Sequence, residues 1–383
     1  MAELELEYDV LTIDTNIFVA NACAIEKGYF KQLAQFKESP ATFVLSDIVK
    51  RELTKHIAEK IKSARGEIKS AIKVASNELL IDDDGCSQAA TLLFGTGEDL
   101  AVAEARVKSF VEKTGCAIIS VKHADVQELV DLYFDAVAPF EATGKKKNEF
   151  PDALALLSLD DWAVKNKKKV LAVSKDAGWK EFGDNSTAID VVNDLGAAIQ
   201  KFQVPNSVSN IVDELKYLLK NGGCHSIIDS VQKAIEKSLD EADVYIDAES
   251  DYMYEYDDVF VSYSMHEFVD SRADGKPKIE LIRIESDRIV IGLEVFVTCS
   301  VEASFSFYVH DSIDNDDMLM GANTATAEEE YNTDILVTLA GDFSDGINGI
   351  EVDDVEVLHS IDSADFGYVR PGFSDDWADE LEE

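Results

Sequence analysis

The 383-residue chain has no long apolar run: nowhere does it approach the roughly 18 consecutive apolar residues that a membrane-spanning helix needs. Its first ten residues, MAELELEYDV, also lack the basic stretch followed by an apolar one that is typical of a secretory signal. We therefore expect a soluble, cytoplasmic protein that has no contact with a membrane.

Cysteine and histidine are sparse as well. The five cysteines are scattered, odd in number and without a C-x-x-C pair, so neither a disulfide framework nor a zinc site is predicted. The six histidines are isolated, and no H-E-x-x-H spacing occurs. These absences exclude the common zinc-dependent enzymes and the small disulfide-stabilised secreted domains.

Three further motifs are incomplete. The segment GTGED at 95–99 lacks the Lys-Ser/Thr ending of a phosphate-binding P-loop, so we interpret it as the start of a helix. The acidic runs at 81–85 and 311–317 lack the glycine and the bidentate glutamate of an EF-hand. We expect both runs to be solvated loops.

Positive charge is the scarcest property. The net charge is −41, from 76 acidic and 35 basic residues. Residues after Pro205 contribute −33, with 43 acidic and 10 basic side chains, whereas residues 1–205 contribute only −8. Proteins that bind nucleic acids usually present a basic surface. Here the basic side chains form only local clusters, at 50–69, 145–147 and 165–169, all in the first part.

Residues 1–205 alternate between short apolar runs and long segments of helical period, which is typical of an α/β domain with a parallel sheet. We expect strands at 9–13, 42–45, 116–121, 169–173 and 187–191. Helices are predicted at 46–81, 97–114, 123–138 and 151–165. The extra helical material at about 62–115 could form a lid or a surface for a partner.

Four carboxylates occupy positions where such a sheet can bring them together. Asp14 and Asp176 follow apolar strands, Glu52 lies in the second turn of a predicted helix, and Asp152 follows Pro151 in a first helical turn. Ligands bind beyond the carboxyl ends of the strands in open α/β sheets. Clustered carboxylates can hold Mg2+, and without a metal they should repel each other and show perturbed pKa values.

The segments TIDTN at 12–16, SDIVKRELTKHI at 46–57, EFPDALALLSL at 149–159 and LAVSKDAGW at 171–179 resemble the ordered motifs of PIN-domain nucleases. The resemblance covers roughly residues 8–195. It implies a Rossmann-like three-layer domain that cleaves RNA, or in some branches flap or single-stranded DNA, using Mg2+ or Mn2+. It also implies the metal-binding and catalytic residues Asp14, Glu52, Asp152 and Asp176, supported by Asn16 and Ser174.

Several neighbouring residues have two interpretations. Glu149 is either a further ligand or a solvated neighbour, and we favour the second. Residues Lys145, Lys146 and Lys147 either hold a substrate phosphate or form a solvated turn. Lys175 faces either the substrate or solvent. We expect the aromatic Trp179 and Phe182 to pack in the core rather than to stack on bases.

Residues 206–383 have a different texture. Two predicted helices at 208–220 and 223–239 precede segments that alternate apolar and acidic residues, which is typical of antiparallel strands with one wet face. We expect a helix-flanked antiparallel β-rich domain, acidic α+β in composition, that ends in the acidic segment FSDDWADELEE. It could bind a basic protein, form a homo-oligomer, cover basic parts of the first domain, or serve only for solubility.

The sequence as a whole predicts a metal-dependent endoribonuclease with an acidic second domain. Two alternatives remain open: a single-stranded or flap DNA nuclease with the same site, and a catalytically silent module that acts through a protein partner of the acidic domain. Recognition of the 2′-hydroxyl depends on groove shape, so no local motif separates RNA from DNA.

Overall fold

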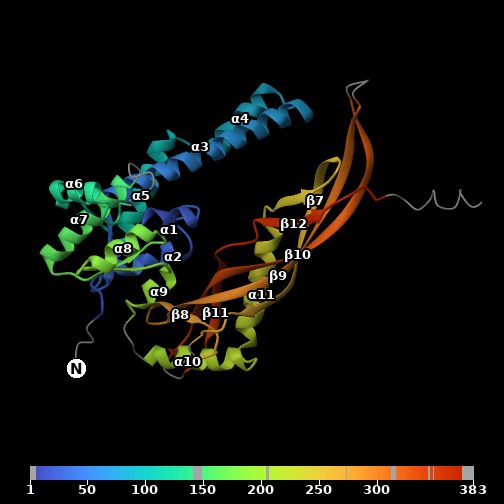
Figure 1. The fold of residues 1–383 in the computed structure, drawn as a ribbon. Coiled ribbons are helices and arrows are strands. Elements are labelled where there is room, and N and C mark those ends of the chain that lie inside the picture. Colours follow the sequence, from blue (N-terminus) through green and yellow to red (C-terminus); the bar gives the residue numbers. More distant parts are fainter. Residues whose placement is uncertain are drawn as a thin grey trace, which may run out of the picture. The chain divides into compact units, whose positions relative to one another are not determined.

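The computed structural model divides into two compact units, Met1–Val204 and Pro205–Glu383 (Figure 1). It describes residues 6–140, 149–203, 207–272, 274–311, 316–343, 346–347 and 349–372. No helix among these residues is both long enough and apolar enough to cross a membrane. All five cysteines are free thiols.

The first unit is built on a sheet of five parallel strands in the order β3-β2-β1-β4-β5. The two central strands, β1 and β4, have their apolar side chains buried on both faces, as expected for a parallel sheet covered by helices. The α/β prediction is therefore confirmed. The strands are β1 (Val10–Ile13), β2 (Thr42–Ser46), β3 (Ala117–Ile119), β4 (Val170–Val173) and β5 (Ile189–Val192).

Helices flank this sheet, and their ends follow local capping rules. Ser46 Oγ accepts a hydrogen bond from Val49 N at 3.1 Å and so caps the long helix α3. Pro151 lies in the first turn of α7, where its missing N–H costs nothing. The helices are α1 (Thr15–Ala20), α2 (Gly28–Gln32), η1 (Leu33–Glu38), α3 (Asp47–Glu78), α4 (Asp83–Phe94), α5 (Asp99–Thr114), η2 (Val121–His123), α6 (Val126–Asp135), α7 (Phe150–Asn166), α8 (Ala177–Asn185) and α9 (Leu195–Gln200).

The acidic run at 81–85 is not the solvated loop that we expected. Asp82 accepts a hydrogen bond from Gly85 N at 2.8 Å and caps α4, and the next two aspartates lie in the first turn of that helix. Acidic side chains are favourable there because the helix dipole is positive at its N-terminus. Part of the second acidic run, 312–315, lies outside the described residues.

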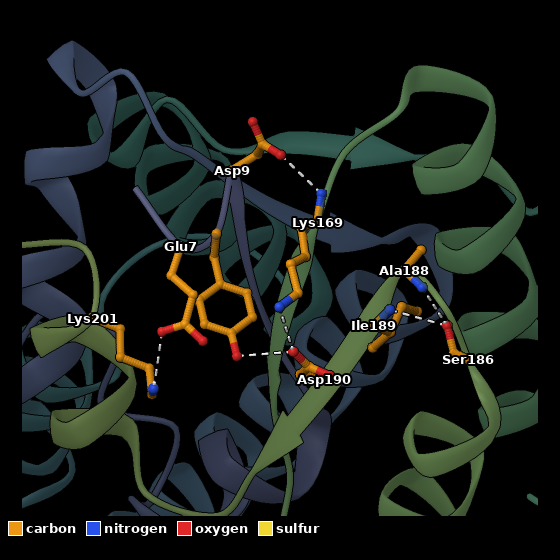
Figure 2. Close-up of polar contacts among 9 residues, drawn as sticks. Glu7, Asp9, Lys169, Ser186, Ala188, Ile189, Asp190 and Lys201 are labelled. Carbon is orange, nitrogen blue, oxygen red and sulfur yellow. Dashed lines mark hydrogen bonds and ion pairs between the residues drawn. The ribbon is translucent and has the colours of Figure 1, made fainter. Parts of the chain in front are cut away.

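Paired charges close the amino edge of the parallel sheet (Figure 2). Lys169 connects two acids: its backbone N–H donates to Asp9 Oδ2 at 2.9 Å, and its Nζ lies 3.1 Å from Asp190 Oδ2. Tyr8 also donates to Asp190 at 2.9 Å, and Lys201 lies 3.4 Å from Glu7. Because Lys168 Nζ also lies 3.0 Å from Asp9 Oδ1, the acids Glu7, Asp9 and Asp190 each have a lysine partner.

The second unit contains an antiparallel sheet in the order β11-β10-β9-β7, with β8 also paired to β9. Helix α11 packs on it through Ile227, Val231, Ile235 and Leu239, which recur every four residues along one face. The elements are α10 (Ser207–Lys220), α11 (His225–Asp240), β6 (Tyr245–Glu249), β7 (Met253–Phe268), β8 (Ile279–Ile284), β9 (Arg288–Asp311), β10 (Asp316–Ala340), β11 (Glu351–Val357) and β12 (Ser363–Tyr368).

The predicted helix-flanked antiparallel architecture is confirmed, with one difference. Strands β6 and β12 form a separate two-stranded sheet in which they run parallel. More than a hundred residues separate these strands, and alternation along a single strand carries no information about the direction of its partner.

Candidate functional site

The carboxyl edge of the parallel sheet carries acids from four different elements. Asp14 directly follows β1, and Asp176 begins α8 after the neighbouring strand β4. Because Ile13 pairs with Val173 in the sheet register, the chain segments that leave these two strands lie side by side. Glu52 comes from the second turn of α3 and Asp152 from the first turn of α7. The electrostatic neighbours of Asp14 include Asp152 and Asp176, and those of Asp152 include Glu52.

Asp14 is the buried member of this group, with only 4% of its surface exposed. Its Oδ2 accepts a hydrogen bond from Ser174 Oγ at 2.6 Å. The same hydroxyl accepts from Asn16 Nδ2 at 3.1 Å and from Asp176 N at 3.0 Å. A serine hydroxyl has one donor and two acceptor positions, so all of its capacity is used. Ser174 therefore fixes the orientation of the Asp14 carboxylate relative to the segment that carries Asp176.

Two of the acids have raised pKa values. Burial is the largest cause for Asp14, and repulsion by Asp152 and Asp176 adds to it, so that its pKa rises to about 7 despite the hydrogen bond from Ser174. Burial also raises the pKa of Asp152 to about 6, with added repulsion from Glu52, Asp176 and Glu149. Desolvation and like charge both favour the neutral form of a carboxyl group. The edge thus concentrates negative charge in a partly dehydrated place, an arrangement often found at functional sites.

Two donors at this edge were not expected from the sequence. Thr15 Oγ1 donates to Glu52 Oε2 at 2.6 Å. Trp179 Nε1 donates to Asp152 Oδ1 at 3.1 Å. Trp179 is fully buried, as predicted, but its indole also serves the acid cluster. The available signal was position: Thr15 follows Asp14 directly, and Trp179 comes three residues after Asp176.

Asp176 is exposed and held by backbone donors. Its Oδ1 accepts from Gly178 N at 2.7 Å and from Trp179 N at 3.2 Å, which makes it the N-cap of α8. A Cβ on Gly178 would lie 3.0 Å from this oxygen and 3.1 Å from the carbonyl oxygen of Pro139. The loop therefore favours glycine two residues after the acid.

The remaining candidates are less well defined. Glu149 is half-buried and adds to the repulsion on Asp152. Lys175 is exposed beside Asp176. The three lysines at 145–147 lie outside the described residues, so their suggested phosphate contact stays a prediction.

The donor set fits a hard divalent cation, because carboxylate oxygens are the ligands that Mg2+ and Mn2+ prefer. The spacing is looser than that of a finished metal site: among the described residues, no three acidic, histidine or cysteine side chains are grouped closely enough to hold an ion. The carboxylates instead accept hydrogen bonds from Ser174, Thr15 and Trp179. Two carboxylates repel each other at distances at which they cannot yet bind the same ion. The acids can therefore raise one another's pKa values without being close enough to form a metal site.

Two grooves in the described residues lie away from these acids. One of about 730 Å3 runs between α3 and α5 and is lined by Lys50, Arg51, Lys55 and Leu100, among others. Another, of about 610 Å3, lies beside β10 and β11 in the second unit. Neither is lined by any of the four acids.

Comparison with known families agrees with this arrangement. A family model described as PIN domain matches residues 11–179, which contain the four acids. The predicted resemblance is thereby confirmed for the N-terminal part of the chain. No curated protein and no solved structure shows significant similarity to the chain.

Proposed function

We propose that the N-terminal PIN domain is a metal-dependent endoribonuclease that hydrolyses RNA phosphodiester bonds at the carboxyl edge of its sheet. The observation that carries this proposal is the convergence of Asp14, Glu52, Asp152 and Asp176 from four separate elements. Burial is the largest cause of the raised pKa values of Asp14 and Asp152, and the electrostatic neighbours that raise them further are other carboxylates. PIN domains are generally nucleases, so this surplus of negative charge is best explained by a bound cation.

In this proposal the four acids hold Mg2+ or Mn2+, with Glu149 as a solvated neighbour. The metal would supply positive charge for the phosphate and activate a water molecule for attack. The protein itself supplies the orientation of the ligands. Ser174 sets the direction of Asp14, Thr15 that of Glu52, and Trp179 that of Asp152. Binding must draw these carboxylates closer together than the spacing described above.

The finer assignments follow from this function. We assign the enzyme to the cytoplasm, where its free cysteines would remain reduced. Lys145, Lys146, Lys147 and Lys175 are the candidates for phosphate contacts near the acids. The acidic second unit would repel nucleic acid, so a basic protein is its expected partner.

The test is cleavage of labelled single-stranded RNA and of DNA with the same base sequence, in Mn2+, Mg2+ or EDTA. We expect RNA to be cut with metal and not in EDTA. Asp14→Asn and Asp176→Asn should each lower the rate on the order of a hundredfold or more, the scale seen when one catalytic electrostatic group is lost. Asp190→Asn is the matched control, because it changes an aspartate at the opposite edge of the same sheet.

The outcomes separate the three functions. Cleavage of DNA but not RNA would replace the substrate and keep the site. Full activity in both Asp14→Asn and Asp176→Asn would overturn the site. Absence of metal-dependent cutting of either substrate would move the function to the acidic unit and its protein partner.

A further inference from the structure

The outer part of α3 and the whole of α4 form a helical arm, defined here as residues 60–94. The buried side chains of α3 are Val49, Leu53 and Ile57, all in its first three turns, and α4 has no fully buried side chain. Figure 1 shows α4 alongside the outer part of α3, away from the parallel sheet. Among the helices that the structure describes, α4 packs mainly on α3. Two helices alone bury too little apolar surface for a stable fold, so a further partner is expected.

Large apolar side chains are exposed at both ends of the arm. At the tip, Leu79 is 72% exposed and Leu80 88% exposed; near the base, Leu92 is 83% exposed and Leu93 60% exposed. Residues 85–94 contain no charged side chain, although 29% of the whole chain is charged. A surface this apolar on a soluble protein marks an interaction site.

Leu80 adds an independent observation. Its φ of 53° lies in the left-handed region, where a bulky side chain is strained and glycine or asparagine is usual. Neither the backbone conformation nor burial within the arm favours leucine at this turn. A role in binding would explain the leucine, because its side chain is exposed.

Charge is separated along the arm in a way that identifies the partner. The tip, residues 77–84, carries four acids and no basic residue. The base, residues 60–76, carries five basic residues and one acid; Arg65 is already paired with Asp99, which leaves four lysines. When two such arms lie antiparallel, each acidic tip meets a basic base, and Leu79 and Leu80 of one copy meet Leu92 and Leu93 of the other. One surface that is complementary to itself is the condition for a two-fold symmetric dimer.

We propose that the arm is the dimerisation surface of the protein and that it pairs antiparallel with the arm of a second copy. The interface consists of the apolar tip and base, with the opposite charges setting the direction of pairing. This proposal does not depend on nuclease activity. It assigns a role to most of the extra helical material at about 62–115.

The first test is sedimentation of the full chain over a wide range of concentration. We expect a reversible monomer–dimer equilibrium. Leu92→Glu should raise the dissociation constant by more than about tenfold, because it places a charge in the apolar contact. Val126→Glu is the matched control: Val126 is 68% exposed on α6 and should have no effect. A wild-type chain that stays monomeric at every concentration overturns the proposal.

A charge exchange tests the direction of pairing. In the variant Asp83→Lys/Asp84→Lys the tip becomes neutral and the base stays positive, whereas in Lys69→Glu/Lys73→Glu the tip stays negative and the base becomes neutral. Each should pair with itself more weakly than the wild type, because neither attraction between tip and base remains, while an equal mixture of the two should form a stronger heterodimer in which the negative tip of one variant meets the positive base of the other. Self-pairing of both variants at the wild-type strength, or no pairing in the mixture, contradicts the antiparallel arrangement.

Leu80→Asn separates binding from folding. It relieves the left-handed strain, so the melting temperature of the monomer should not fall, while the dissociation constant of the dimer should rise several-fold. A lower melting temperature with unchanged dimerisation would show that Leu80 serves the fold of the arm alone.

Discussion

The pKa values of aspartates are shifted in opposite directions at the two edges of the parallel sheet. At the amino edge, Asp9 and Asp190 are paired with lysines: burial alone would raise their pKa values, but hydrogen bonds and cations lower both below the ordinary value. At the carboxyl edge, burial and neighbouring carboxylates raise the pKa of Asp14 and Asp152. An aspartate beside a strand is therefore not informative by itself. Its partners distinguish a structural charge from a functional one.

The acids at the amino edge already have their charges paired. Its acids are about half exposed, each has a cation within 3.4 Å, and none needs a further ligand. The acids at the carboxyl edge have hydrogen-bond donors but repel one another, and in the proposed function a cation relieves this repulsion. Loss of a charged partner at the amino edge should consequently lower the free energy of unfolding, whereas removal of a carboxylate at the carboxyl edge should raise it.

The largest effect on stability is expected for Asp14→Asn in EDTA. Between about pH 4 and pH 7 the folded protein keeps a proton on Asp14 that the unfolded chain has released, so the free energy of unfolding falls as the pH rises through this range. Removing the carboxylate should restore on the order of 2–4 kcal/mol at pH 8 and much less at pH 5. Urea unfolding at both pH values measures this difference in the free energy of unfolding between the variant and the wild type. A variant less stable than wild type at pH 8 would contradict the raised pKa.

A smaller effect is expected from the donors that orient the acids. Thr15→Val and Trp179→Phe each remove one hydrogen bond to a carboxylate and keep most of the side-chain volume. Loss of such supporting contacts typically weakens metal binding or activity about 10- to 100-fold. Cleavage rates measured against Mn2+ concentration should show a higher metal requirement in both variants. Tyr8→Phe removes a comparable bond at the amino edge and should leave the metal requirement unchanged.

The smallest effect is expected at the amino edge. Lys169→Met breaks the contact with Asp190, but both side chains are nearly half exposed, and such pairs contribute roughly 0.2–1 kcal/mol. The stability that these acids provide is present above their unfolded pKa and is lost as the pH falls through their lowered folded pKa. Thermal melts at low and high salt should show a small loss that salt reduces. A loss of several kcal/mol would mean that this edge does more than close the sheet.

Features that depend on local sequence were predictable. Apolar runs located all five strands of the first unit within a few residues, and Pro151 and Ser46 located helix starts. The positions of Asp14 and Asp176 after adjacent strands followed from the sheet alone. The short helices α1, α8 and α9 were not predicted. They have six to nine residues, too few for a repeating pattern of apolar residues to be recognised.

Features that depend on distant residues were not predictable. Thr15 and Glu52 are 37 residues apart, and Trp179 and Asp152 are 27 apart, so only the packing of α3 and α7 brings each pair together. The acidic run at 81–85 was misinterpreted because aspartates suit both a loop and the first turn of a helix. Telling these apart requires knowing that α4 follows α3 back along the arm.

Binding of Mn2+ to the purified protein tests the central claim most directly, measured as the change in melting temperature between EDTA and saturating metal. Wild type and Asp190→Asn should both gain stability, because a ligand that binds only the folded state stabilises it. Asp14→Asn should gain little. The same gain in all three proteins, or none in wild type, would contradict the assignment of the carboxyl edge as a metal site.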